Sequence, residues 1–244
     1  MSRNYELLRR AGKEDVLFNR SRSDSLPNYN GHRRLDLGKQ AHEETLKLVQ
    51  HVFVFPNSHA PRAVVFSSIQ GRGSGEICSR AGEVLASQGS TSVCLVDANL
   101  CAPSLHQLFE VANSPGLMDA TVKAAPIIDF TVRIAGNLWL LPSGSSTAEA
   151  HGLFASPQLC SRIAELREVF DYVLIDAPAF GSNSDAVMLG QMSDGVILVV
   201  EANCTRRETA RMAKETFEGA RVKLLGAILN NRTFPIPEAL YRML

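Results

Sequence analysis

The sequence lacks an excess of charge of either sign, because 25 lysines and arginines face 25 aspartates and glutamates over 244 residues. This balance argues against nucleic acid as a partner. Paired cysteines are also lacking, since the five cysteines are scattered without a C-x-x-C spacing. An odd set of this kind is typical of free thiols in a reducing cytoplasm, and it argues against a disulfide framework or a zinc site.

Long apolar runs are absent as well. No run approaches the ~20 residues that cross a bilayer, and residues 1–15 are charged where a signal peptide would be apolar. We therefore expect a cytoplasmic protein with no membrane span of its own. Any contact with the inner face of the membrane is expected to be made through a partner.

Composition divides the chain into two parts. Residues 3–12 are predicted to form a short basic helix, and the polar stretch that follows, broken by Pro27 and Gly31, has few residues that can build a core. We expect residues 1–41 to be this short helix and a flexible arm. Residues 42–244 are long enough for one α/β domain and too short for two.

Apolar runs alternate with helical stretches through residues 42–244. Six runs are short and continuously apolar, as in parallel strands covered on both faces; they lie at 63–68, 92–96, 138–141, 172–175, 195–200 and 222–229. Helices are predicted at 42–52, 75–87, 157–169, 184–192 and 205–218. The alternation predicts an α/β fold with a doubly wound, mostly parallel sheet and helices on both faces.

A glycine-rich turn joins the first predicted strand to the next helix. Three alternate glycines permit positive φ and close approach of the backbone to an anion, and the N–H groups of a following helix can cradle phosphate. The candidate nucleotide-binding residues are therefore Gly71, Arg72, Gly73, Ser74, Gly75, Glu76 and Ile77. The alternative is a flexible turn without a ligand.

The groups that perform phosphate transfer are missing from this turn. A competent phosphate loop carries a lysine that reaches the β- and γ-phosphates, followed by a hydroxyl that binds Mg²⁺. Those two places hold Ser74 and Gly75, and Glu76 adds a carboxylate near the expected phosphates. We expect weak binding of ATP or ADP, with or without Mg²⁺, through backbone N–H groups.

Two acids end apolar runs and are the candidate metal and residual catalytic residues. Asp97 ends the second predicted strand and Asp176 a later one, so both are expected at the carboxyl edge of the sheet, where α/β proteins bind ligands. Carboxylates of this kind hold Mg²⁺ directly or through water. The alternative is that each acid caps the turn or helix after it.

Taken together, these motifs resemble the bacterial tyrosine kinases (BY-kinases) of capsule and exopolysaccharide synthesis, which are P-loop NTPase-like proteins. The resemblance covers about residues 43–244. The family's loop P-G-E-G-K-S-T aligns without gaps on 70–76, V-D-A-D-L-R-R-P on 96–103 and D-x-V-I-I-D-T-P-P on 171–179. The resemblance implies a P-loop NTPase-like domain over 42–244, with Asn230 near the adenine.

The departures from the family pattern fall on the residues that perform phosphate transfer in the family. Ser74 replaces the lysine, Gly75 the magnesium hydroxyl and Asn99 the second acid. The ring-forming E-x-x-R-x-x-R helix survives only as Glu44, Lys47 and Gln50. Tyr241 is the only tyrosine after Tyr172, whereas the family carries a tyrosine-rich C-terminal tail. The chain is therefore predicted to be a catalytically degenerate member that keeps the fold for binding.

Three functions follow in order of preference. The first is a regulator of exopolysaccharide or capsule synthesis that docks on a membrane polysaccharide co-polymerase or an active kinase paralogue, with homo-oligomer formation as a further expectation. The second is a slow ATP-dependent tyrosine autokinase or ATPase that uses Asp97 and Asp176. The third is a dinucleotide-binding Rossmann protein, because Gly71, Gly73 and Asp97 imitate part of that fingerprint, although Glu76 stands where its third glycine belongs.

Overall fold

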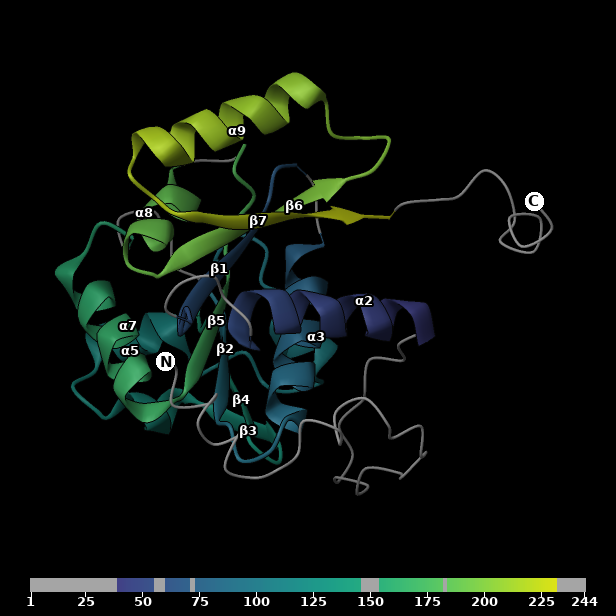
Figure 1. Cartoon of the computed structure of the whole chain (residues 1–244). Coiled ribbons are helices and arrows are strands. Elements are labelled where there is room, and N and C mark those ends of the chain that lie inside the picture. The colour runs from purple at the N-terminus through teal and green to yellow at the C-terminus, as the bar shows by residue number, and fades with distance from the viewer. Residues whose placement is uncertain (1–38, 55–59, 71–72, 146–153, 182–183, 232–244) are drawn as a thin grey trace.

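The fold is an α/β sandwich built around one sheet (Figure 1). A computed structural model describes residues 39–54, 60–70, 73–145, 154–181 and 184–231. The predicted helix at 3–12 and most of the arm lie outside these residues. Within them, no helix is both long and apolar enough to cross a membrane.

Seven strands form the sheet in the order β3-β4-β2-β5-β1-β6-β7. All neighbours pair in parallel except β3 and β4, which are antiparallel. Their bounds are β1 (Ala63–Ser68), β2 (Val93–Asp97), β3 (Val132–Ala135), β4 (Leu138–Leu141), β5 (Tyr172–Asp176), β6 (Gly195–Glu201) and β7 (Leu224–Asn230). The predicted fold class, a doubly wound and mostly parallel sheet, is confirmed.

Helices cover both faces of the sheet. One face is packed by α2 (Lys39–Val49), the π-helical turn η2 (Gln50–Val54), α3 (Ser74–Ser87) and α4 (Leu105–Leu108). The other is packed by α5 (Leu117–Val122), the 3₁₀ turn η3 (Ile127–Phe130), α7 (Pro157–Val169), α8 (Asp185–Gln191) and α9 (Arg207–Gly219). Strands β1, β2 and β5 are buried along their whole length, which is why they appear in the sequence as unbroken apolar runs.

The prediction missed the antiparallel strand β3 and the short elements α4, α5 and η3. Strand β3 has only four residues and is joined to β4 by Gly136 and Asn137, with Gly136 at φ 48°. A two-residue Gly-Asn connection of this kind signals a β-hairpin. The short helices cover less than two turns each, so their sequences lack the periodicity on which helix prediction depends.

Candidate functional site

The candidate site lies where β1 ends and α3 begins, at the carboxyl edge of the sheet. Asp97 and Asp176 are register partners at the ends of the neighbouring strands β2 and β5. The predicted loop residues Gly71 and Arg72 lie outside the described residues, and Gly73 is the N-cap of α3. The structure therefore brings the described part of the loop and both predicted acids to one place.

Gly73 and Asn230 are neighbours across the site. Gly73 has φ 118°, and a Cβ at this residue would lie 2.8 Å from Nδ2 of Asn230. Glycine is needed here on both counts, because L-residues avoid this φ and the amide fills the space that a side chain would take. Asn230, the last residue of β7, thus lies beside the phosphate loop.

Ser74 occupies the lysine position and points inward. It is the first residue of α3, is buried, and its hydroxyl hydrogen-bonds the carboxyl group of Asp176. A lysine at this position would bring a cation toward bound phosphate. Serine supplies no cation, and its hydroxyl is already hydrogen-bonded to Asp176.

Gly75 lets α3 approach the acids closely. A Cβ at Gly75 would lie 2.7 Å from Oγ of Ser104 and 3.0 Å from Oδ2 of Asp176. Real Cβ atoms do not tolerate such distances, so a side chain here requires Ser104 to move. The position that holds the magnesium hydroxyl in a competent loop is therefore adjacent to Asp176, but it is filled by Ser104.

Glu76 and Ile77 point in opposite directions. The Glu76 side chain is exposed and forms a salt bridge of 3.5 Å with Arg80, one turn along α3. Its carboxylate is thus partly compensated and lies on the solvent side of the helix. Ile77 is buried in the core shared by α2, α3 and the sheet, so its side chain contributes packing.

Asp97 accepts hydrogen bonds from three backbone N–H groups. Its Oδ2 accepts from Ser104 N and Leu105 N, each at 2.9 Å, and its Oδ1 accepts from Asn99 N at 3.3 Å. The carboxylate therefore holds the loop after β2 and the start of α4. Burial raises the pKa of Asp97 to about 6, and these three donors limit the rise.

Asp176 is also buried, but it has fewer hydrogen-bond partners than Asp97. It is 1% exposed, and its Oδ1 has no hydrogen-bond partner. Burial raises the pKa of Asp176 to about 8, with a smaller contribution from the negative charge of Asp97 and opposition from the Ser74 hydroxyl. The acid is therefore largely protonated at neutral pH in this conformation.

These residues do not fit a directly bound Mg²⁺. The metal requires near-octahedral oxygen coordination, whereas Asp97 is occupied by backbone donors and Ser74 by Asp176. Among the described residues, no group of three or more histidine, cysteine, aspartate or glutamate side chains is placed to hold a metal. Only Oδ1 of Asp176 offers an unpartnered carboxyl oxygen here.

Sequence reasoning missed two residues of the site. Ser104 packs against Gly75, and the only signal was a serine directly before α4, the residue type typical of a helix N-cap. Cys78 lies fully buried near both acids; burial, and then the negative charges of Asp176 and Asp97, raise the pKa of its thiol well above the usual range. Nothing in the local sequence distinguishes Cys78 from a core residue.

Several residues of the motifs have structural roles outside the site. Asp194 accepts hydrogen bonds from Arg62 N and Ala63 N at the start of β1 and pairs with Arg167 at 2.8 Å. Asp119 accepts from Gly116 N at 2.9 Å and completes the first turn of α5. These acids fix connections between strands and helices.

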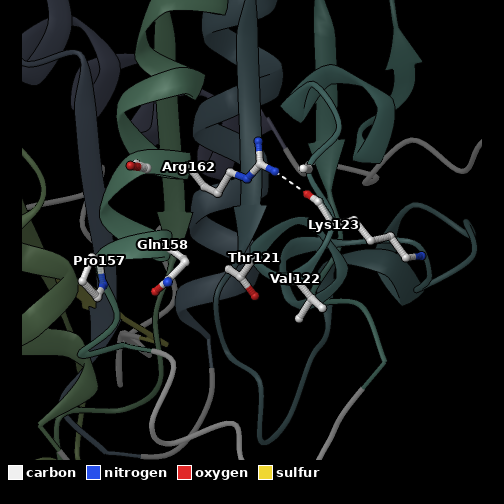
Figure 2. A pocket seen from close by; sticks show the side chains of 8 residues that line it. Thr121, Val122, Lys123, Pro157, Gln158 and Arg162 are labelled. Carbon is white, nitrogen blue, oxygen red and sulfur yellow. Dashed lines mark hydrogen bonds between the residues drawn. The ribbon is translucent and has the colours of Figure 1, made fainter.

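Two shallow pockets lie on the α7 side of the sheet and not at the phosphate loop. One, of about 340 Å³, lies between α5 and α7 and is lined by residues that include Val122, Lys123 and Arg162. Figure 2 shows Arg162 reaching from α7 toward the carbonyl oxygen of Lys123, to which it donates a hydrogen bond. Arg162 also donates to Ala120 O, so it binds the C-terminal end of α5 to α7.

Comparison with known proteins places this geometry in a family. A family model described as "Cellulose biosynthesis protein BcsQ" matches residues 63–221. The tyrosine-protein kinase YwqD of Bacillus subtilis (strain 168) is 30% identical over 171 residues, which cover 69% of this chain and 71% of YwqD. The chain belongs to this family of bacterial tyrosine kinases and BcsQ-like proteins.

Further members agree with this assignment. The succinoglycan biosynthesis transport protein ExoP of Rhizobium meliloti (strain 1021) is 29% identical over 170 residues, which cover 68% of this chain but only 22% of ExoP. The kinase domain of VpsO has the same fold, with a TM-score of 0.70, 24% identity and coverage of 80% of this chain and 98% of that domain. The resemblance to bacterial tyrosine kinases of polysaccharide synthesis is thus confirmed.

Proposed function

We propose that this member of the bacterial tyrosine kinase family is a catalytically degenerate regulator of exopolysaccharide or capsule synthesis. It is proposed to dock on a membrane polysaccharide co-polymerase or an active kinase paralogue, and so to act at the inner face of the membrane. The names of its relatives support the pathway, since they include tyrosine-protein kinases and a succinoglycan transport protein.

One observation carries the proposal of lost catalysis. The residue in the lysine position, Ser74, is buried and hydrogen-bonded to Asp176, and the next residue, Gly75, packs against Ser104. Stabilising a transferring phosphoryl group requires a cation and a metal aimed at its oxygens. In this chain, residues 74 and 75 instead pack α3 against Asp176 at the end of β5 and against Ser104.

Weak nucleotide binding remains part of the proposal. Gly73 keeps the left-handed N-cap of α3, so the backbone N–H groups of the first helical turn still face the loop. Asn230 lies beside Gly73, and the resemblance to the family implies that it contacts the adenine. We therefore propose that residues 73–77 and Asn230, with Gly71 and Arg72, form a nucleotide site that binds ATP or ADP weakly and without a requirement for Mg²⁺.

Calorimetric titration of the full chain with ATP and ADP, with and without Mg²⁺, tests this proposal beside a turnover assay. We expect weak heats that do not depend on Mg²⁺, and no turnover above background; an absence of any heat would contradict the nucleotide site. A turnover number of about 1 per second, which is ordinary for kinases, would contradict the degenerate interpretation.

A variant with a repaired loop distinguishes two causes of weak nucleotide binding, namely the loss of the lysine cation and the closure of the pocket. We propose the variant Ser74→Lys/Gly75→Ser/Glu76→Thr combined with Ser104→Ala, because removing the Ser104 hydroxyl makes room for a side chain at residue 75. We expect Mg²⁺-dependent ATP binding in this variant. The matched control is the same triple change with Ser104 retained, in which we expect weaker binding.

A slow autokinase or ATPase is the second candidate. It is favoured by the retained register of Asp97 and Asp176 at neighbouring strand ends. Low turnover that is lost in Asp176→Asn and kept in Asp129→Asn, a change of an exposed acid in η3, would favour it over the first candidate.

The dinucleotide-binding alternative finds no support in the strand order. In the Rossmann arrangement the first two strands are neighbours. Here β1 lies between β5 and β6 and is separated from β2 by β5. We do not carry this alternative further.

A further inference from the structure

The second pocket on the α7 side of the sheet is rich in sulfur. It has a volume of about 360 Å³ and lies on the face of the sheet opposite to α3 (Figure 1). Its described lining residues are Phe154, Ala155, Cys160, Met188, Gln191 and Met192. Three of these six side chains carry sulfur, and none of the three has a role in the nucleotide site proposed above.

The three sulfur-bearing side chains come from two helices that pack on the same face. Met188 and Met192 are four residues apart at the end of α8, so they project from one side of the helix, with Cβ atoms about 5–6 Å apart. Cys160, in the first turn of α7, lines the same pocket. Methionine has three rotatable side-chain bonds, so both thioethers can turn toward an ion held by the thiol while the helices stay in place.

The pocket presents these side chains to a small ion. Cys160 is exposed and forms no disulfide. Met188 and Met192 are half-buried; each packs against the core with part of its surface and lines the pocket with another part. By contrast, Cys78 and Cys94 are fully buried. Of these thiols, only that of Cys160 is open to a metal ion in the folded chain.

The donor set selects the kind of ion. The described lining residues include no carboxylate and no imidazole. Mg²⁺ requires oxygen ligands, and structural Zn²⁺ requires four ligands drawn from thiolate, imidazole and carboxylate. Thiolate and thioether sulfur select Cu(I) instead. One thiolate and two neutral thioethers also carry a single negative charge, which matches the charge of a monovalent ion.

We propose that Cys160, Met188 and Met192 bind one soft monovalent metal ion, of the class of Cu(I), in a three-sulfur site that joins α7 to α8. On binding, the S–H bond of Cys160 breaks, an S–Cu bond forms and the proton passes to solvent. Each thioether donates a lone pair, and neither copper nor sulfur changes oxidation state. Because the site exists only when α7 and α8 are packed together, the ion stabilises the folded state by mass action.

Competition for Cu(I) with the chelator bathocuproine disulfonate, under anaerobic reducing conditions, tests the site. The full chain carries Cys101→Ser/Cys204→Ser as a background, which removes the other two exposed thiols. In this background we expect one Cu(I) per chain, and a thermal midpoint that rises with the concentration of the metal. Failure to bind Cu(I) would overturn the proposal.

Variants of each ligand identify the sulfur atoms. Losing an outer-shell partner of a metal ligand costs about 10- to 100-fold in affinity, so losing a ligand should cost at least as much. We therefore expect at least about tenfold weaker binding in Met188→Leu/Met192→Leu, which nearly conserves side-chain volume, and a greater loss in Cys160→Ser. The matched control is Met118→Leu/Met212→Leu, two methionines outside the pocket, which should bind as the background does.

Further measurements make the outcome unambiguous. The metal-free variants must keep the thermal midpoint of the background to within the error of the methionine control, which shows that α7 and α8 remain packed. X-ray absorption at the copper edge should count three sulfur neighbours. Undiminished binding in Met188→Leu/Met192→Leu would overturn the proposal, because the thiol alone would then capture the ion. Binding of Zn²⁺ as tight as that of Cu(I) would also overturn it, because the site would then lack the selectivity of thioether ligands.

Discussion

The ends of β2 and β5 present the same residue in the same register but in different surroundings. Asp97 accepts three backbone hydrogen bonds, whereas Asp176 has one serine hydroxyl and one carboxyl oxygen without a partner. Both follow an apolar run, so their local sequences look alike. The comparison teaches that an acid at a strand end can hold a loop in place or remain available for chemistry, and that the neighbouring segments decide which.

The largest expected effect concerns the titration of Asp176. Its folded-state pKa, about 8, lies above the ordinary value of 3.8, so the folded state binds the proton more tightly than the unfolded state. The stability due to the protonated acid is complete below about pH 4 and is lost as the pH rises through 8. We expect the free energy of unfolding to fall by up to about 1.4 kcal/mol per pH unit in the middle of this window, from about pH 5 to pH 7, and the slope to vanish above about pH 9.

Denaturant unfolding between pH 6 and pH 9 measures this slope. Asp97, with a pKa of about 6, contributes mainly below this range. Asp176→Asn should flatten the profile, and Asp129→Asn should leave it unchanged. A parent profile that is already flat would mean that Asp176 stays ionised and is compensated by a group not recognised here.

The next largest effect is expected for Asp97→Ala. The change leaves the N–H groups of Ser104 and Leu105 without an acceptor, and Leu105 is fully buried. We expect a loss of about 3 kcal/mol in the free energy of unfolding, measured by urea denaturation at pH 7. Asp97→Asn keeps one acceptor oxygen and should lose about 1 kcal/mol. Equal losses in the two variants would show that the backbone donors are not the reason.

A smaller effect is expected for Gly75→Ser. The new side chain meets Ser104 Oγ and Asp176 Oδ2, and overpacking of this kind costs about 1 to 2 kcal/mol. Ser104→Ala removes the nearer contact, so the double variant should recover part of the loss. Additive losses in a double-mutant cycle would instead place the strain at Asp176.

The smallest effect is expected for Glu76→Gln. The exposed Glu76 pairs with the half-buried Arg80 one helical turn along, and helical pairs with a solvent-exposed partner contribute less than about 1 kcal/mol. We expect a shift in thermal midpoint near the limit of detection by differential scanning calorimetry. A loss comparable with that of Asp97→Ala would show that the charge of Glu76 acts inside the site.

Much of the fold followed from the sequence because buried parallel strands have a simple signature. The six predicted strands all occur, with ends within two residues of the observed ones. The additional strand β3 and the short helices were missed, because four to six residues give no reliable periodicity. The short helix and flexible arm predicted at 1–41, and the domain boundary after residue 41, stay predictions.

The candidate site was located but its internal contacts were not. Spacing alone was sufficient to place Gly73, Ser74 and Gly75 at the start of a helix and both acids at the edge of the sheet. The hydrogen bond of Ser74 to Asp176 depends on a residue about one hundred positions away. The contact of Gly75 with Ser104 depends on how the loop after β2 folds over α3.

The sequence by itself determined the doubly wound sheet, the position of the loop and the absence of the lysine, because each is written in local periodicity or in a single residue type. Only the tertiary structure decided that Asp97 accepts a hydrogen bond from the start of α4, that Asp176 is buried with an unpartnered oxygen, and that Ser104 fills the space at Gly75. The physical reason is that pKa, hydrogen bonding and steric fit depend on atoms brought together from β2, α3, α4 and β5, and no local stretch of the chain contains them all.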